Sequence, residues 1–280
     1  MSRRPAAAVN LLKTWALIVG ASALLGGLGW LIGGYRLFSI ALFAGLLGGI
    51  ALYWYADRAL LGIVRARELV ETEAPALFAA AERIAGRART PRPRLYLIRD
   101  GHPRVLSAGR GGKGHSLIFT SGLLAAAQPA ELESLVAHEI VHSARRDLLT
   151  QTVAGVVAST LLEISRAGGW LSRGLLFVLG PIASAIVHAL LSQRREYTAD
   201  LEAARLCESP HGLADALLRL EQANELISFE GNPALEPVYV VNPFEETGLA
   251  ALFVTHPPTP ERVARLRALD PEWSDRVEAA

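Results

Sequence analysis

Cysteine is nearly absent from this chain, because its 280 residues include a single one, Cys207. An internal disulfide is therefore impossible, and a zinc ribbon built from cysteine thiolates is excluded. Any metal site must use histidine and carboxylate ligands. Cys207 lies in the helical run EAARLC, where we expect it to be a small, packed apolar residue.

An excess of charge of one sign is also missing. Lysine and arginine number 28 and aspartate and glutamate 27, which gives a formal net charge of +1. The sequence shows no basic stripe with interleaved aromatic residues, the usual electrostatic footprint of a nucleic-acid-binding protein. We therefore expect no nucleic-acid partner.

Apolar residues, by contrast, are abundant and concentrated near the start. Residues 14–34 contain no charge over 21 positions, and residues 37–56 contain none over 20. Each run is long enough to cross a bilayer as a helix. Both carry glycine pairs at the four-residue spacing that lets helices approach closely, namely Gly29 with Gly33 and Gly45 with Gly49. Aromatic residues near the ends fit an interfacial belt: Trp15, Trp30, Tyr35, Trp54 and Tyr55. Residues 1–57 are therefore predicted to form a transmembrane hairpin in contact with the lipid bilayer.

A cleaved signal peptide is the alternative for the first run, with ASA at 21–23 as its cleavage site. The apolar run continues well past ASA, and a second run follows almost at once, which favours the hairpin. Basic residues flank the hairpin on both sides: Arg3, Arg4 and Lys13 before it, and Arg58, Arg65 and Arg67 after it. By the positive-inside rule, both ends of the hairpin face the cytoplasm.

The segment that follows has the pattern of a mixed α and β domain. Residues 68–90 predict an amphipathic helix, and 95–98, the centre of 101–114, and 115–122 predict three strands of a small sheet. Pro129 and Glu131 suit the first turn of a helix that continues through LVAHEIVHSARRD.

Two weaker apolar runs come next. Residues 148–162 and 174–193 predict a second membrane hairpin, although Pro181 interrupts the latter run and the alternative is a buried pair of soluble helices. Residues 194–280 are again soluble in character. The predicted fold is an α+β membrane protein, mostly helical, with domain parts at 1–57, 58–147, 148–193 and 194–280.

The motif HEIVH carries the strongest chemical signal. Positions i and i+4 of a helix lie on one face, so His138 and His142 can point two imidazoles at one ion. Glu139 can reach a water on that ion and serve as general base. A chance match is the alternative, and it occurs on the order of once per hundred chains of this length. The motif also falls in a predicted helix, as the chemistry requires.

A third ligand is needed, because catalytic zinc usually takes three protein ligands and keeps one position open. Glu196 and Asp200 lie four apart on a helical face in QRREYTADLEAARLC. Glu196 is the candidate ligand, and Asp200 can orient a ligating imidazole through a hydrogen bond. Alone, both would more often be solvated charges, but their occurrence together with the HEIVH helix favours the metal-site roles.

Four segments, in this order, resemble the HtpX-type membrane zinc proteases, which share a superfamily with the CAAX prenyl proteases: HEIVHSARRD, REYTADLEAARL, VYVVNPF and THPPTPERVARL. The resemblance spans most of the chain. It implies a gluzincin-like protease domain with one Zn²⁺ per chain, bound by His138, His142 and Glu196. It also implies that Glu139 is the base and that Asp200 supports a ligand.

Three further residues match the family pattern. His256 and Arg262 fall in its H-P-x-x-x-x-R region, where the resemblance implies that they stabilise the oxyanion of the tetrahedral intermediate. A turn residue before two prolines is the alternative for His256. Asp147 matches a family acid to which the sequence assigns no role, and a structural role at a helix end is equally consistent.

One departure concerns the edge strand, which typically reads NAFATGR in the family and is replaced here by PRVLSAGR. Only Gly109 and Arg110 match. An edge strand can bind an extended peptide through its backbone, so the change bears on substrate preference rather than on mechanism.

The sequence thus predicts a multi-pass zinc metalloendopeptidase of the inner (plasma) membrane with its active site facing the cytoplasm. The resemblance implies polypeptide substrates, membrane proteins among them, and a role in protein quality control. One alternative is a narrow maturation or prenyl-protein protease, which has the same domain and a different substrate pocket. The other is a non-catalytic membrane scaffold with a relic zinc site, which the intact motif residues disfavour.

Overall fold

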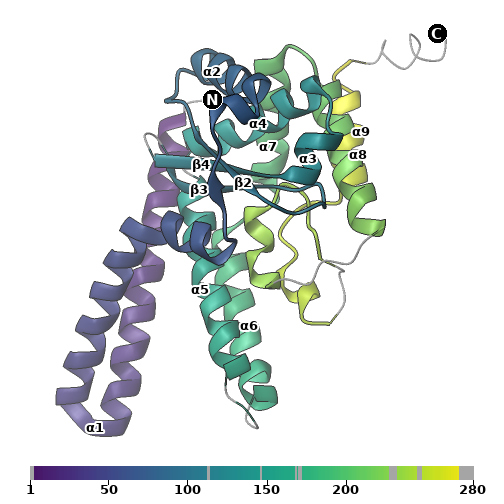
Figure 1. Ribbon diagram of the computed structural model, residues 1–280. Coiled ribbons are helices and arrows are strands. Elements are labelled where there is room, and N and C mark those ends of the chain that lie inside the picture. The colour runs from purple at the N-terminus through teal and green to yellow at the C-terminus, as the bar shows by residue number, and fades with distance from the viewer. Residues whose placement is uncertain are drawn as a thin grey trace.

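The computed structural model describes residues 3–111, 114–145, 147–167, 169, 172–226, 232–244 and 248–270. The chain is mostly helical and contains a small mixed sheet, in agreement with the predicted fold class. Two helical pairs extend from the same side of the body that holds the sheet (Figure 1). They are the two halves of α1 and the pair α5–α6.

The first pair is a hairpin within α1 (Arg3–Ile63), which turns back at Gly33 and Gly34. Gly34 has a φ of 64°, in the left-handed region that glycine adopts without a Cβ clash. The predicted close approach of the helices is confirmed at Gly49, where an added Cβ would lie 2.3 Å from Ile18 Cγ2. Trp15 also stacks on Tyr53 across the hairpin. The predicted helical hairpin is therefore present, with Ala8–Gly27 and Gly29–Ile63 both apolar and long enough to cross a membrane.

The second half of α1 continues past the predicted boundary at residue 57. Its last turns contact protein, since Leu60 is fully buried and Asp57 lies 3.4 Å from the Arg94 guanidinium. The hairpin is thus continuous with the body of the molecule at this end.

The sheet has the strand order β1-β2-β4-β3, with β1 Arg67–Glu68, β2 Arg94–Ile98, β3 Val105–Gly111 and β4 Gly114–Thr120. β2 and β4 are parallel, and the other two pairings are antiparallel. The three predicted strands are confirmed, and β3 lies at the sheet edge as expected.

Two local predictions were wrong. The helix expected over 68–90 begins only at Pro75 (α2, Pro75–Ala88), because Arg67 and Glu68 pair with β2 and a short 3-10 turn, η1 (Glu71–Glu73), follows. The strand expected over 115–122 ends at Thr120, and the helix α3 (Ser121–Ala126) follows at once, with its first turn capped by the Thr120 side chain.

The helix α4 (Pro129–Arg145) lies at the centre of the body and packs against α2, α7 (Arg194–Cys207) and α8 (His211–Leu226). Its apolar face enters the main core with Leu135, Val136 and Ile140, which are fully buried. The α9 helix (Thr259–Arg267) closes over α7 and α8. Cys207 is half-buried and packs against this core, as predicted.

The second helical pair consists of α5 (Asp147–Ala167) and α6 (Ser172–Leu190). Of the two, α6 is apolar and long enough to cross a membrane, and it carries exposed Phe177 and Val178. By contrast, α5 buries Val153, Ala154 and Ala158 against α1, α6 and the 3-10 helix η3 (Pro233–Val238). The short 3-10 helix η4 (Ala250–Phe253) packs on α6.

Candidate metal centre

The two histidines of the HEIVH motif face one point inside the body, as the helical spacing predicts. Their Nε2 atoms lie 3.2 Å apart, and both side chains are almost fully buried. The helix α7 brings Glu196 to the same point, with its Oε2 3.4 Å from His138 Nε2 and 3.5 Å from His142 Nε2. Glu196 lies 54 residues after His142 in the sequence, and the predicted second hairpin makes up most of the residues between them.

The cluster has the chemical properties of a cation site. The three ligand atoms lie within 4.8 Å of one another, and their identity, two imidazole nitrogens and one carboxylate oxygen, suits zinc. Oε1 of the buried Glu196 carboxylate has the Arg195 Nε at 3.0 Å, while Oε2 faces the two imidazoles and accepts no hydrogen bond from the described residues. A buried carboxylate oxygen without a hydrogen bond is costly unless a cation compensates it. His138, His142 and Glu196 therefore fit a metal ion.

The electrostatics of the cluster favour charge on each member. Burial disfavours the charged form of His142, but Glu196 and Asp147 offset it and raise the pKa of His142 to about 10. Burial likewise opposes ionisation of Glu196, yet the charges of His142, His256 and Arg195 hold the pKa of Glu196 well below its usual range. Glu196 is thus an anionic side chain at the point where a cation would bind.

Asp200 contacts the imidazole that the sequence assigned to it. Its Oδ1 lies 3.0 Å from His138 Nδ1, on the opposite side of the ring from Glu196. Arg262 donates to both oxygens of Asp200, at 2.9 Å from Nε and 2.7 Å from the terminal nitrogen Nη2. Although burial raises the pKa of Asp200, Arg262 lowers it to about 2. Asp200 is therefore an anion that Arg262 fixes in ion-pair contact with the His138 ring.

Arg262 reaches the cluster, with Nη2 3.9 Å from Glu196 Oε2, but most of its guanidinium is bonded to other groups. Besides its two bonds to Asp200, the guanidinium donates to the Val240 carbonyl oxygen at 2.7 Å, and the side chain is 1% exposed. Three of its five N–H groups are thus used to hold other parts of the protein. Arg262 therefore braces Asp200, and its expected role at the oxyanion stays a prediction.

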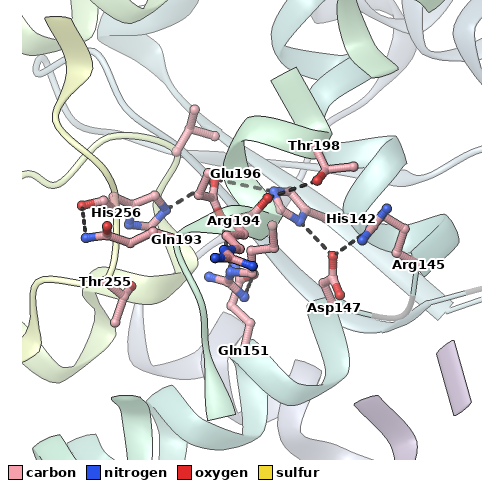
Figure 2. Close-up of polar contacts among 12 residues, drawn as sticks. His142, Arg145, Asp147, Gln151, Gln193, Arg194, Glu196, Thr198, Thr255 and His256 are labelled. Carbon is pink, nitrogen blue, oxygen red and sulfur yellow. Dashed lines mark hydrogen bonds and ion pairs between the residues drawn. The ribbon is translucent and has the colours of Figure 1, made fainter. Parts of the chain in front are cut away.

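His256 does lie beside the cluster, with Nε2 3.7 Å from Glu196 Oε2. Figure 2 shows His256, Glu196 and His142 in a row, with Asp147 beyond His142. The Gln193 side chain donates to the His256 carbonyl oxygen at 3.3 Å. The imidazole of His256 therefore has one ring nitrogen directed at the cluster.

The other ring nitrogen of His256 contacts Glu236, a residue that sequence reasoning missed. Glu236 Oε1 lies 2.8 Å from His256 Nδ1 and accepts the backbone N–H groups of Thr255 and His256 at 3.0 and 3.1 Å. Its second oxygen accepts the Thr255 hydroxyl at 2.6 Å. Burial disfavours the charged form of Glu236, but His256 and Thr255 outweigh it and lower the pKa of Glu236. The one available signal was a single acid in the apolar stretch NPALEPVYVV.

Asp147, to which the sequence assigned no role, contacts His142, the second histidine of the motif. Its Oδ2 lies 3.3 Å from His142 Nδ1 and 3.4 Å from Arg145 Nε. Each ligating imidazole thus has its own carboxylate on Nδ1, Asp200 for His138 and Asp147 for His142. Such pairs fix the ring orientation and leave Nε2 free for a metal.

Glu139 is buried beside the ligands, at 2% exposure, and its Oε2 accepts no hydrogen bond from the described residues. A carboxylate in that state is available to a water in the site. This is the arrangement that a general base requires.

The edge strand is less open than the sequence suggested. On its outer side, Val105 O accepts the Val240 N–H at 3.3 Å, and the Gly109 N–H donates to Thr152 Oγ1 at 3.2 Å. Leu106 also forms an isolated antiparallel bridge with Tyr239. An extended peptide therefore cannot pair along the whole of β3 in this conformation.

A cavity of about 480 Å³ lies next to the cluster, on the side of His256 and Arg262. Its lining also includes Val241, Asn242 and Phe244, together with the acidic residues Glu221 and Glu225. The cavity is large enough for one or two amino-acid side chains beside the reactive groups.

The cluster combines two histidines of one helix, a glutamate of a second helix and the neighbouring Glu139. This combination has the chemistry of a metalloprotease centre. Comparisons with known proteins identify the family to which this centre belongs. Residues 71–270 match the model of peptidase family M48, and the chain belongs to that family.

Relatives cover nearly the whole chain. It is 36% identical to the protease HtpX homolog of Thermococcus kodakarensis over 93% of this chain and 96% of that one. It is 37% identical to the protease HtpX homolog of Pyrococcus abyssi over 92% and 95% of the two chains. Among solved structures, S. mikatae Ste24p aligns with a TM-score of 0.49 and 17% identity, covering 92% of this chain and 64% of that one. The chain is thus a membrane-associated metalloprotease of the HtpX-like kind, as the sequence predicted.

Proposed function

We propose that the chain is a zinc-dependent endopeptidase that hydrolyses peptide bonds of membrane or membrane-proximal proteins. The observation that carries this proposal is the buried cluster of His138, His142 and Glu196, directly beside Glu139. The Glu196 Oε2 atom, which faces both imidazoles, accepts no hydrogen bond from the described residues. The three ligands would hold one Zn²⁺ per chain. When bound, the ion would polarise the scissile carbonyl and acidify a water.

The protein's own groups would perform the proton transfers. Glu139 takes the proton of the attacking water, and the same carboxyl group then delivers it to the leaving amine. His256 directs Nε2 at the cluster and is placed to donate a hydrogen bond to the oxygen that gains charge. Asp200, braced by Arg262, keeps the His138 ring in its ligating orientation.

The experiment that tests this function is proteolysis of an unfolded protein, such as casein, by the detergent-purified chain. Cleavage that depends on zinc is expected. A chain that binds zinc but cleaves neither casein nor itself would be the scaffold with a relic site. If the chain does not cleave casein but cleaves one membrane or prenylated protein, the alternative of a narrow maturation or prenyl-protein protease is supported.

Glu236 is a positioning residue in this proposal, because it fixes the ring of His256. His256→Ala is expected to lower kcat by about 100- to 1,000-fold with zinc retained. Glu236→Gln should lower kcat by about 10- to 100-fold, the range typical of groups that orient a functional side chain, with little change in KM. The measurement is kcat and KM for a model peptide with both single variants and the double variant.

The double variant separates positioning from general support of the fold. If Glu236 acts through His256, adding Glu236→Gln to His256→Ala changes kcat little further. Additive losses, or a loss that appears only in KM, would contradict the role given to Glu236.

The proposed setting is the inner (plasma) membrane, with the metal centre on the cytoplasmic side. The positive flanks of the first hairpin support this orientation, and the helical pairs leave the body on one side (Figure 1). Single cysteines in a chain with Cys207→Ser test it. Tyr35→Cys, at the hairpin tip, should react with an impermeant thiol reagent on intact cells, and Ser121→Cys only after permeabilisation. The reverse pattern would overturn the orientation.

A further inference from the structure

A polar residue in the first membrane segment lies against the metal centre. Asn10 belongs to the candidate span Ala8–Gly27, where an amide side chain is costly in lipid and usually has a specific partner. Its side-chain nitrogen donates to Asp147 Oδ1 and, at 3.3 Å, to the Arg145 carbonyl oxygen. Both acceptors lie where α4 ends and α5 begins.

Asp147 divides its two oxygens between the membrane hairpin and a metal ligand. Oδ1 receives the Asn10 amide, while Oδ2 lies 3.3 Å from His142 Nδ1. The carboxylate is 5% exposed, so these protein groups rather than solvent determine its orientation. A three-residue connection therefore runs from α1 through Asp147 to His142.

The same end of α1 is fixed to the body by further contacts. Thr150 Oγ1 lies 3.2 Å from both the Asn10 carbonyl oxygen and the Thr14 hydroxyl. Lys13 Nζ donates to the Leu190 carbonyl oxygen at the end of α6, at 3.1 Å. Leu11 and Leu17 pack on a buried cluster formed by Ala56, Leu149 and Val153. Asn10 is thus held in place against α5.

We propose that Asn10 is a positioning residue for the metal centre: it orients Asp147, which in turn orients the ligand His142. Groups that hydrogen-bond to a ligating imidazole typically contribute about 10- to 100-fold to metal affinity. Asn10 acts one bond further out, so it contributes near the lower end of that range. The membrane hairpin and the metal are then coupled, and by linkage zinc binding strengthens the docking of α1 on α5.

The test is zinc affinity of the detergent-solubilised full chain, measured by competition with a chelating dye. Asn10→Ala is expected to lower the affinity about tenfold, and Asn10→Asp, which sets a second carboxylate against Asp147, to lower it further. Thr14→Val is the matched control, because it removes a buried hydroxyl contact between the same two helices without touching Asp147. It should leave zinc affinity unchanged.

A double-mutant cycle that combines Asn10→Ala with Asp147→Ala distinguishes a positioning role of Asn10 from a general loss of structure. In that background, Asn10→Ala should have no further effect on zinc affinity, since the connection is already broken. Equal zinc affinity of Asn10→Ala and the parent would overturn the inference, and so would an equal loss in Thr14→Val. The inference rests on the proposed zinc site, but the two fail differently. A parent chain that binds no zinc refutes the proposed function. A parent chain that binds zinc with the same affinity as Asn10→Ala refutes this inference alone.

Discussion

Glu139→Gln is expected to bind zinc nearly as well as the parent and to lose about 100- to 10,000-fold in cleavage rate, the usual contribution of a general base. Glutamine keeps the shape of the side chain and a hydrogen-bonding group but cannot accept the water's proton. Glu139 is buried beside the ligands without being one of them, so its replacement leaves the three ligand atoms as they are. The measurement is bound zinc and the cleavage rate of a model peptide, in detergent.

Glu133→Gln is the matched control, because it makes the same change on the same helix, where Glu133 pairs with Arg83 at 2.8 Å away from the cluster. It should bind zinc and cleave like the parent. Retained cleavage in Glu139→Gln would rule out this glutamate as the base. Loss of zinc together with cleavage would mean that the Glu139 carboxylate helps to hold the metal site.

Glu196→Ala is expected to lose zinc and cleavage together. The substitution removes the only carboxylate ligand of the cluster and leaves Arg195, whose Nε lies 3.0 Å from Glu196 Oε1, without that counter-charge. The loss of zinc affinity should exceed the roughly 10- to 100-fold expected for Asp200→Ala, which removes a group that only orients a ligand. Zinc per chain and affinity by chelator competition measure both variants.

Thr198→Ala serves as the control for this experiment, since Thr198 lies two residues along α7 and its hydroxyl donates to the Arg194 carbonyl oxygen of its own helix. Glu196→Gln keeps the side-chain volume if the alanine variant unfolds, and it should also lose most of its zinc affinity. Normal zinc in a folded Glu196→Ala protein would identify another ligand, with His256 at 3.7 Å from this carboxylate as the nearest candidate.

The part of the site that lies on single helices could be predicted from sequence. The spacing of His138 and His142, and of Glu196 and Asp200, fixes each pair on one face, because helical periodicity is a local property. The resemblance to the HtpX-type proteases added support for the prediction that these two helical faces meet in one metal site. The three strands could likewise be read from short apolar runs.

Contacts between distant segments could not be predicted. Asn10 and Asp147 are 137 residues apart, and Arg262 reaches Asp200 across 62. Glu236 lies in the short 3-10 helix η3 and His256 in a loop, so no local periodicity relates the two residues. The false helix start at residue 68 has the same origin, since pairing of Arg67 and Glu68 with β2 overrides a local helical pattern.

The measurement that tests the central claim most directly is a zinc titration of the metal-free chain, with cleavage of casein as the readout. Chelation should abolish cleavage, and activity should return in proportion to added zinc until about one ion per chain is bound, as a single site with three protein ligands requires. Cleavage that persists after complete removal of zinc, or zinc binding at one ion per chain without any return of cleavage, would contradict a metal-dependent endopeptidase built on His138, His142 and Glu196.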